Sequence, residues 1–147
     1  MNTAPLHRLV YTSVYRAGRV DNALSALRAI LSTSRKNNEA ANVTGYLIFD
    51  GDSFIQVLEG PLAALEATMA RIAADERHRD VSVLGTHPAE TRLFREWKMG
   101  GYRRTPQQDP IFAAHGISGQ IDPSRVDFET AVSLAQALSL EEAKHTR

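Results

Sequence analysis

The first apolar segment of the chain, residues 6–13, is rich in β-branched and aromatic side chains and predicts a strand. On that strand Leu9, Tyr11 and Ser13 share one face. Residues 21–35 instead carry apolar side chains every three or four positions, which predicts an amphipathic helix. The stripe of this helix consists of Leu24, Leu27, Leu31 and, at the next position of the same spacing, Ser34.

Two further apolar segments, residues 43–50 and 53–59, flank the step Asp50-Gly51. Such a step between strands predicts a β-hairpin, because both residues tolerate a positive φ. Pro61 then ends the second strand and suits the first turn of a helix. The apolar stripe of that second helix consists of Leu62, Leu65, Met69 and Ile72.

Residues 81–86 and 92–99 predict two more strands, the first of which is closed by Pro88. The order of elements is then βαββαββ, which is typical of the α+β class and of a ferredoxin-like sandwich. We therefore expect a mixed sheet with two helices side by side on one of its faces.

The chain changes character after the last of these strands. Residues 102–109 are polar and include a proline, which predicts a connector, and Asp109 and Asp122 each precede a proline, which predicts helix starts. The last segment has one apolar side, formed by Phe128, Val132, Ala135 and Leu138. We expect a domain over residues 6–101 and a C-terminal helical extension over 102–147 that packs on the bare sheet face or on a partner.

Composition narrows the functional classes. The 147 residues include 17 Lys and Arg against 17 Asp and Glu, so the formal net charge is zero, which argues against nucleic acid as a partner. There is no cysteine, which excludes disulfides, thiol catalysis and Cys-ligated metals, and the five histidines show no HxxxH or HxH pairing, so no metal site is expected. The N-terminus does not resemble a signal peptide and no window is apolar enough to span a membrane, so we expect a cytoplasmic protein.

Several polar residues fall where packing alone would place apolar ones. Gln56 shares a strand face with Phe54 and Leu58, and a buried amide without a partner costs about 1–3 kcal/mol. Its partner is either backbone or water, or else a ligand or a catalytic group. Asn38 continues the stripe of the first helix, although Asn also commonly caps helix ends. Tyr11 is on the first strand and faces the helices if Leu9 does. The simpler interpretation of such a tyrosine is a core residue whose hydroxyl is hydrogen-bonded at the edge of the core.

Four segments of the chain form a recognisable set: the strand LVYTS, the segment SRKNNEAANVTGYLIFDGDSFIQVLEG, the stretch RIAADERH and the ending FREWKMG. In their order and spacing they resemble the BLUF family, blue-light sensors that use FAD. The resemblance covers about residues 6–101 and implies the same βαββαββ sandwich, with the flavin ring between the two helices. The residues after 101 match nothing diagnostic.

The resemblance implies roles at the centre of the site. Tyr11 would donate an electron and a proton to light-excited FAD, and Gln56 would lie between Tyr11 and the flavin. Trp97 and Met99 would exchange places or hydrogen bonds near Gln56 after illumination. Rotation or tautomerisation of the Gln56 amide would reverse its hydrogen bonds and give a red-shifted signalling state.

The resemblance also implies how the cofactor is held. Asn38, with Asn37 beside it, would bind the C4 carbonyl and N3 side of the ring, and Ile30 and Ile72 would sandwich it. The residues expected near the ribityl or phosphate part are Arg71, Asp75, Arg77 and His78. The signal would pass to a separate downstream protein or to self-association as a dimer or larger homo-oligomer, and no enzymatic turnover is expected.

Two other functions use the same fold. Acylphosphatase-like sandwiches hydrolyse phosphoryl groups with an Arg and an Asn, which Arg35 and Asn38 could imitate, but residues 14–20 contain a single glycine where a Gly-rich phosphate loop is needed. A flavin-free interaction module is the other alternative. The colour of the purified protein distinguishes these functions, since only the photoreceptor requires a bound flavin and therefore a yellow protein.

Overall fold

The computed structural model describes residues 5–15, 23–50, 52–76, 78–94, 100–103 and 105–145. The sandwich elements are β1 (Leu6–Tyr15), α1 (Ala23–Ala41), β2 (Thr44–Phe49), β3 (Ser53–Pro61), α2 (Leu62–Ala74), β4 (His78–Pro88) and β5 (Gly100–Arg103). The elements that follow are η1 (Pro106–Gln108), α3 (Asp109–Ala114), η2 (Pro123–Arg125) and α4 (Phe128–His145), where η marks a 3₁₀ helix.

The strands form one mixed sheet in the order β4-β1-β3-β2-β5. β1 pairs antiparallel with β3 and β4, β2 pairs antiparallel with β3, and β5 lies parallel to β2. This confirms the predicted α+β ferredoxin-like sandwich with a mixed sheet. The centre of the sheet is closed to solvent, because every residue of β2 and nearly every residue of β3 is buried.

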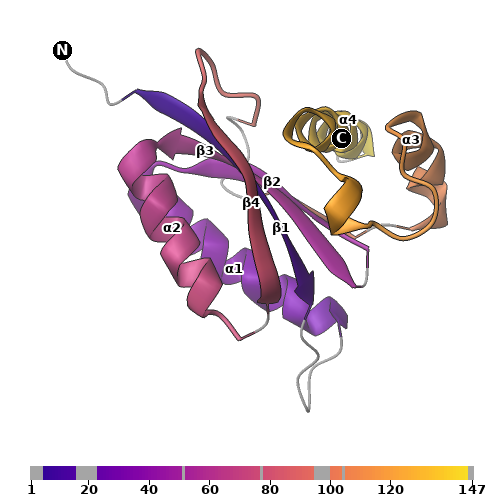
Figure 1. The fold of residues 1–147 in the computed structure, drawn as a ribbon, viewed down its shortest axis with the longest axis horizontal. Helices are drawn as coiled ribbons and strands as arrows, with labels where there is room; N and C mark the ends of the chain where they lie inside the picture. The colour runs from indigo at the N-terminus through magenta and orange to yellow at the C-terminus, as the bar shows by residue number, and fades with distance from the viewer. Residues whose placement is uncertain are drawn as a thin grey trace.

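The sheet is covered on both faces (Figure 1). Helices α1 and α2 lie on one face over a core that includes Leu9, Tyr11, Phe54 and Leu58. Helices α3 and α4 lie on the other face, where the strands contribute Val10, Tyr46, Ile48, Ile55 and Val57 to a second core. The alternation of side chains along each strand therefore builds two separate apolar layers, one on each face.

The fifth strand differs from the prediction. Residues 92–94 are not in a strand, residues 95–99 fall outside the described residues, and β5 comprises Gly100–Arg103. The expected connector 102–109 therefore begins with strand residues. The physical reason lies in the hydrogen bonds: the backbone N–H groups of Leu93 and Phe94 donate to the carboxylate of Glu59, so they are not available for pairing with a strand.

Helix α1 continues beyond the predicted end at residue 35 and stops at Ala41. Asn42 takes the left-handed conformation, with a φ of 59°, and the N–H of Val43 donates to the carbonyl of Asn38 at 2.9 Å. Asn38 is therefore inside the helix and does not cap it. In the tail, Asp122 caps the short helix η2, and the long helix begins only at Phe128.

Candidate functional site

A narrow cleft lies between the α1–α2 pair and the sheet. Its lining comes from β1, β3, β4, both helices and the α2–β4 turn. The lining residues are Tyr11, Ile30, Thr33, Ser34, Asn37, Asn38, Gln56, Thr68, Arg71, Ile72, Asp75 and His78. Most of the residues that the sequence singled out are thus brought together in one place.

The floor of the cleft is formed by a tyrosine and a glutamine in direct contact. Tyr11 and Gln56 are opposite each other in the β1–β3 register, and their side chains point to the face covered by α1 and α2. Cross-strand neighbours on one face lie close enough for their side chains to bond. The phenol of Tyr11 donates a hydrogen bond to Oε1 of Gln56, and both side chains are almost completely buried.

The electrostatics of this floor keep the phenol uncharged. Burial raises the pKa of Tyr11 far above its usual range, and the nearby carboxylate of Asp75 raises it further. The ring of His78 meets that of Tyr11 edge-on, with 6.3 Å between centroids. A hydrogen bond of 2.8 Å joins Nδ1 of His78 to Oγ of Ser13, which fixes the imidazole beside the tyrosine.

The sheet is irregular beside the tyrosine. The pairing of β1 with β4 shifts register between Val10 and Tyr11 and again between Thr12 and Val14. Such bulges often occur next to functional sites, where they change the direction of a side chain.

The upper part of the cleft combines apolar walls with amide groups. Ile30 of α1 and Ile72 of α2 both line it. Asn38 is almost completely buried and Asn37 half-buried, and both lie about two turns further along α1 than Ile30. This arrangement offers aliphatic surface to a flat ring and amide donors and acceptors to its polar edge.

Three lining residues were not predicted as site residues: Thr33, Ser34 and Thr68. Thr33 and Ser34 lie between Ile30 and Asn37 at helical spacing, so the period of α1 could have indicated them. Thr68 orients a cation, because Nη2 of Arg71 donates to its hydroxyl at 3.2 Å while that hydroxyl donates to the carbonyl of Ala64.

Three of the predicted site residues cannot be placed. Arg77, Trp97 and Met99 fall outside the described residues. Their predicted roles therefore stay predictions.

The cleft residues fit a flavin in chemistry. Aliphatic and amide side chains line one space of about 460 Å³, part of it open to solvent.

The family model described as "Sensors of blue-light using FAD", BLUF, matches residues 6–100 of the chain. The chain is a member of the BLUF family. This confirms the resemblance found in the sequence, and it makes this chain a relative of proteins that sense blue light through a flavin.

Relatives of known function share the BLUF part of the sequence. The photoactivated adenylate cyclase subunit alpha of Euglena gracilis is 33% identical over 94 residues, which are 64% of this chain and 9% of the cyclase. The blue light- and temperature-regulated antirepressor BluF of Escherichia coli is 31% identical over 87 residues, which are 58% of this chain and 22% of that protein. The chain thus spans a small fraction of these curated relatives.

Solved BLUF structures resemble the chain over most of its length. The photo-activated state of BlsA superposes with a TM-score of 0.78 at 26% identity, covering 90% of this chain and 94% of BlsA. The dark state of BlrB, a BLUF protein, gives a TM-score of 0.76 at 26% identity and covers 94% of this chain and 98% of BlrB. Among the helices that the structure describes here, none is long and apolar enough to cross a membrane.

Proposed function

We propose that this chain is a blue-light photoreceptor in which Tyr11 and Gln56 form the photochemical switch. The observation that carries the proposal is the buried hydrogen bond from the phenol of Tyr11 to Oε1 of Gln56 at the floor of the cleft. A bound flavin would supply absorption of blue light and an electron acceptor in its excited state. The protein has to supply the electron and proton donor and a group that retains the change.

Tyr11 suits the role of donor because its environment keeps the phenol protonated. Burial raises the pKa of Tyr11, so the proton is present before illumination and has a defined acceptor in Oε1 of Gln56. An amide suits the role of switch because one end accepts and the other donates. Rotation or tautomerisation of the Gln56 side chain would reverse the hydrogen bonds around it with little change in shape.

The remaining predicted residues would hold the cofactor. Ile30 and Ile72 would contact the faces of the ring, and Asn37 and Asn38 its polar edge. Arg71, Asp75 and His78 would contact the ribityl or phosphate part of the cofactor. We propose the same role for Arg77. We propose FAD as the flavin, as in the description of the family, and we propose that Trp97 and Met99 respond to the rearranged Gln56.

The output of the sensor is proposed to pass to another protein or to a second copy of this chain. Relatives named for an adenylate cyclase and for an antirepressor connect BLUF sequences with effectors of different kinds. The balanced charge fits a protein partner better than nucleic acid or an acidic membrane surface, and we place the protein in the cytoplasm.

An enzymatic function of the acylphosphatase type is less well supported. Arg35 is exposed on α1 and is not among the residues lining the cleft that Asn38 lines. The cation near the lining amides is Arg71, which is held by Thr68.

The test is an absorption spectrum of the purified protein, supplied with flavin, in darkness and directly after blue illumination. The expected result is a flavin spectrum that shifts slightly to the red and returns in darkness. A protein that binds no flavin, or binds it without a reversible shift, would overturn the proposal.

The proposed role of Arg71 gives a second prediction. Replacement of Arg71 by methionine is expected to weaken binding of FAD and FMN by up to about fivefold, since an exposed charged pair contributes at most about 1 kcal/mol. Riboflavin, which has no phosphate, should bind with unchanged affinity, as measured by flavin fluorescence titration.

The matched control is Arg28→Met, because Arg28 is also an exposed helical arginine but does not line the cleft. It should leave all three affinities unchanged. Equal weakening of riboflavin by Arg71→Met would show that the substitution damages the ring site and that Arg71 does not recognise phosphate.

A further inference from the structure

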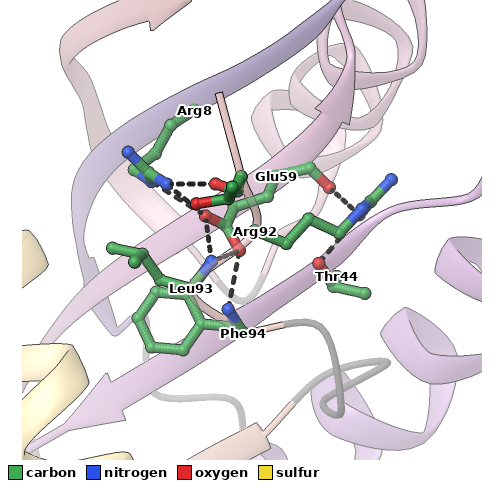
Figure 2. Close-up of polar contacts among 7 residues, drawn as sticks. Arg8, Thr44, Glu59, Arg92, Leu93 and Phe94 are labelled. Carbon is green, nitrogen blue, oxygen red and sulfur yellow. Dashed lines mark hydrogen bonds and ion pairs between the residues drawn. The ribbon is translucent and has the colours of Figure 1, made fainter. Parts of the chain in front are cut away.

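Strand β3 carries a buried carboxylate on the face opposite to the cleft. Glu59 is three residues beyond Gln56 and is completely buried, and Figure 2 shows it surrounded by donors. Its cross-strand neighbour Arg8 bonds to it through Nε at 2.8 Å and Nη2 at 2.7 Å. The backbone N–H groups of Leu93 and Phe94 donate to it at 2.9 and 2.8 Å.

A second side chain fastens the same segment. Nη1 of Arg92 donates to the hydroxyl of Thr44 at 2.8 Å and to the backbone carbonyl of Glu59 at 2.9 Å (Figure 2). Its Nη2 donates to the carbonyl of Asn42 at 2.8 Å. Residues 92–94 are thus attached to β2 and β3 by both side chain and backbone.

Stability alone is a weak explanation for this carboxylate. A buried ion pair has a desolvation penalty that can exceed its Coulombic gain, and an apolar replacement of similar size is often as stable. What the carboxylate provides is position: it fixes the backbone of Leu93 and Phe94, the residues directly before the stretch that contains Trp97 and Met99.

The fixed segment continues towards the C-terminal helix. The ring of Phe94 stacks on that of Tyr46, with 5.9 Å between centroids and 24° between planes. The hydroxyl of Tyr46, a completely buried residue of β2, donates to the carboxylate of Glu142 on α4. One series of direct contacts therefore runs from β3 through residues 93–94 and Tyr46 to α4.

We propose that Glu59 is a positioning residue that couples the light-driven change on β3 to helix α4. The inference rests on the proposed function of Tyr11 and Gln56. A shift of β3 at Gln56 moves Glu59 on the same strand, and the carboxylate carries Leu93 and Phe94 with it. Phe94 then displaces Tyr46 and alters its bond to Glu142, so the light-driven change reaches α4.

The experiment compares Glu59→Gln with the unaltered protein, both loaded with FAD, by two measurements. One is the light-induced red shift, and the other is the difference between lit and dark hydrogen exchange of the amides of α4. The unaltered protein is expected to show both. Glu59→Gln should keep the red shift, because it leaves the cleft intact, but its exchange difference in α4 should be about fivefold smaller.

Arg92→Met provides a second variant if Glu59→Gln does not fold, since it removes three hydrogen bonds of the same segment and leaves the buried ion pair in place. It should reduce the exchange difference in the same direction. The matched controls are Glu66→Gln and Arg125→Met, both of exposed residues; Glu66 lies on α2, and Arg125 forms its ion pair with Asp122. Both should behave like the unaltered protein.

The outcomes separate this inference from the proposed function. An exchange difference that survives in Glu59→Gln and Arg92→Met, or that is absent from an unaltered protein with a normal red shift, would overturn the coupling while the photoreceptor proposal stands. Loss of the red shift in Glu59→Gln would also overturn it, because Glu59 would then act in the photochemistry itself. An unaltered protein without any red shift would overturn both.

Discussion

Replacement of Tyr11 by phenylalanine is expected to abolish the reversible red shift while flavin stays bound. The substitution keeps the buried ring and removes only the hydroxyl, which is the donor to Oε1 of Gln56. Without the phenol there is neither a readily oxidised side chain nor a proton at that position. The measurement is the difference spectrum before and after a blue flash, at equal flavin occupancy.

The matched control is Tyr15→Phe on the same strand. Tyr15 is half-buried, contacts Phe49 and Phe54 with its ring, and does not line the cleft, so removal of its hydroxyl should leave the red shift intact.

Gln56→Leu removes the acceptor of the hydrogen bond from Tyr11 and should abolish the red shift as Tyr11→Phe does. A normal red shift in either Tyr11→Phe or Gln56→Leu would contradict the proposed mechanism.

Strands β1 to β4 and helices α1 and α2 were predictable because each of them has a local signal, whereas β5 has none. The hairpin between β2 and β3 illustrates this: the step at Asp50 predicted a turn, and Oδ1 of Asp50 accepts from the N–H groups of Asp52 and Ser53. The C-terminal end of helix α1 was harder to predict. The polar stretch after residue 35 remains helical, with Asn38 buried, and the helix ends only at the left-handed turn of Asn42.

The candidate site was predictable where polar residues interrupt an apolar pattern. Gln56 and Tyr11 could be assigned to one face by the period of their strands, and the register then brings them together. The Glu59 arrangement could not be predicted, because a Glu near a strand end is ordinarily solvated. Its partners Leu93 and Phe94 are 34 and 35 residues away, in a stretch whose apolar side chains had predicted a strand.

Replacement of Leu134 by alanine is expected to lower the free energy of unfolding by about 2–5 kcal/mol. Leu134 is completely buried on α4 and belongs to the core that covers the sheet face of Val10, Ile55 and Val57. Truncation leaves a cavity in that core and removes apolar contacts from both α4 and the strands. Urea denaturation of the FAD-loaded protein, followed by circular dichroism, measures the change.

Leu140→Ala is the matched control, since Leu140 lies on the same helix and is 60% exposed. Its effect should stay within about 0.5 kcal/mol. A large loss in Leu134→Ala, together with a single unfolding transition, would mean that α4 and the sheet unfold as one cooperative unit. Such a unit is what a sensor needs if a change on β3 is to reach α4. A loss as small as that of Leu140→Ala would instead mark residues 102–147 as a separable extension, and α4 could then detach from the sheet on illumination without unfolding the flavin site.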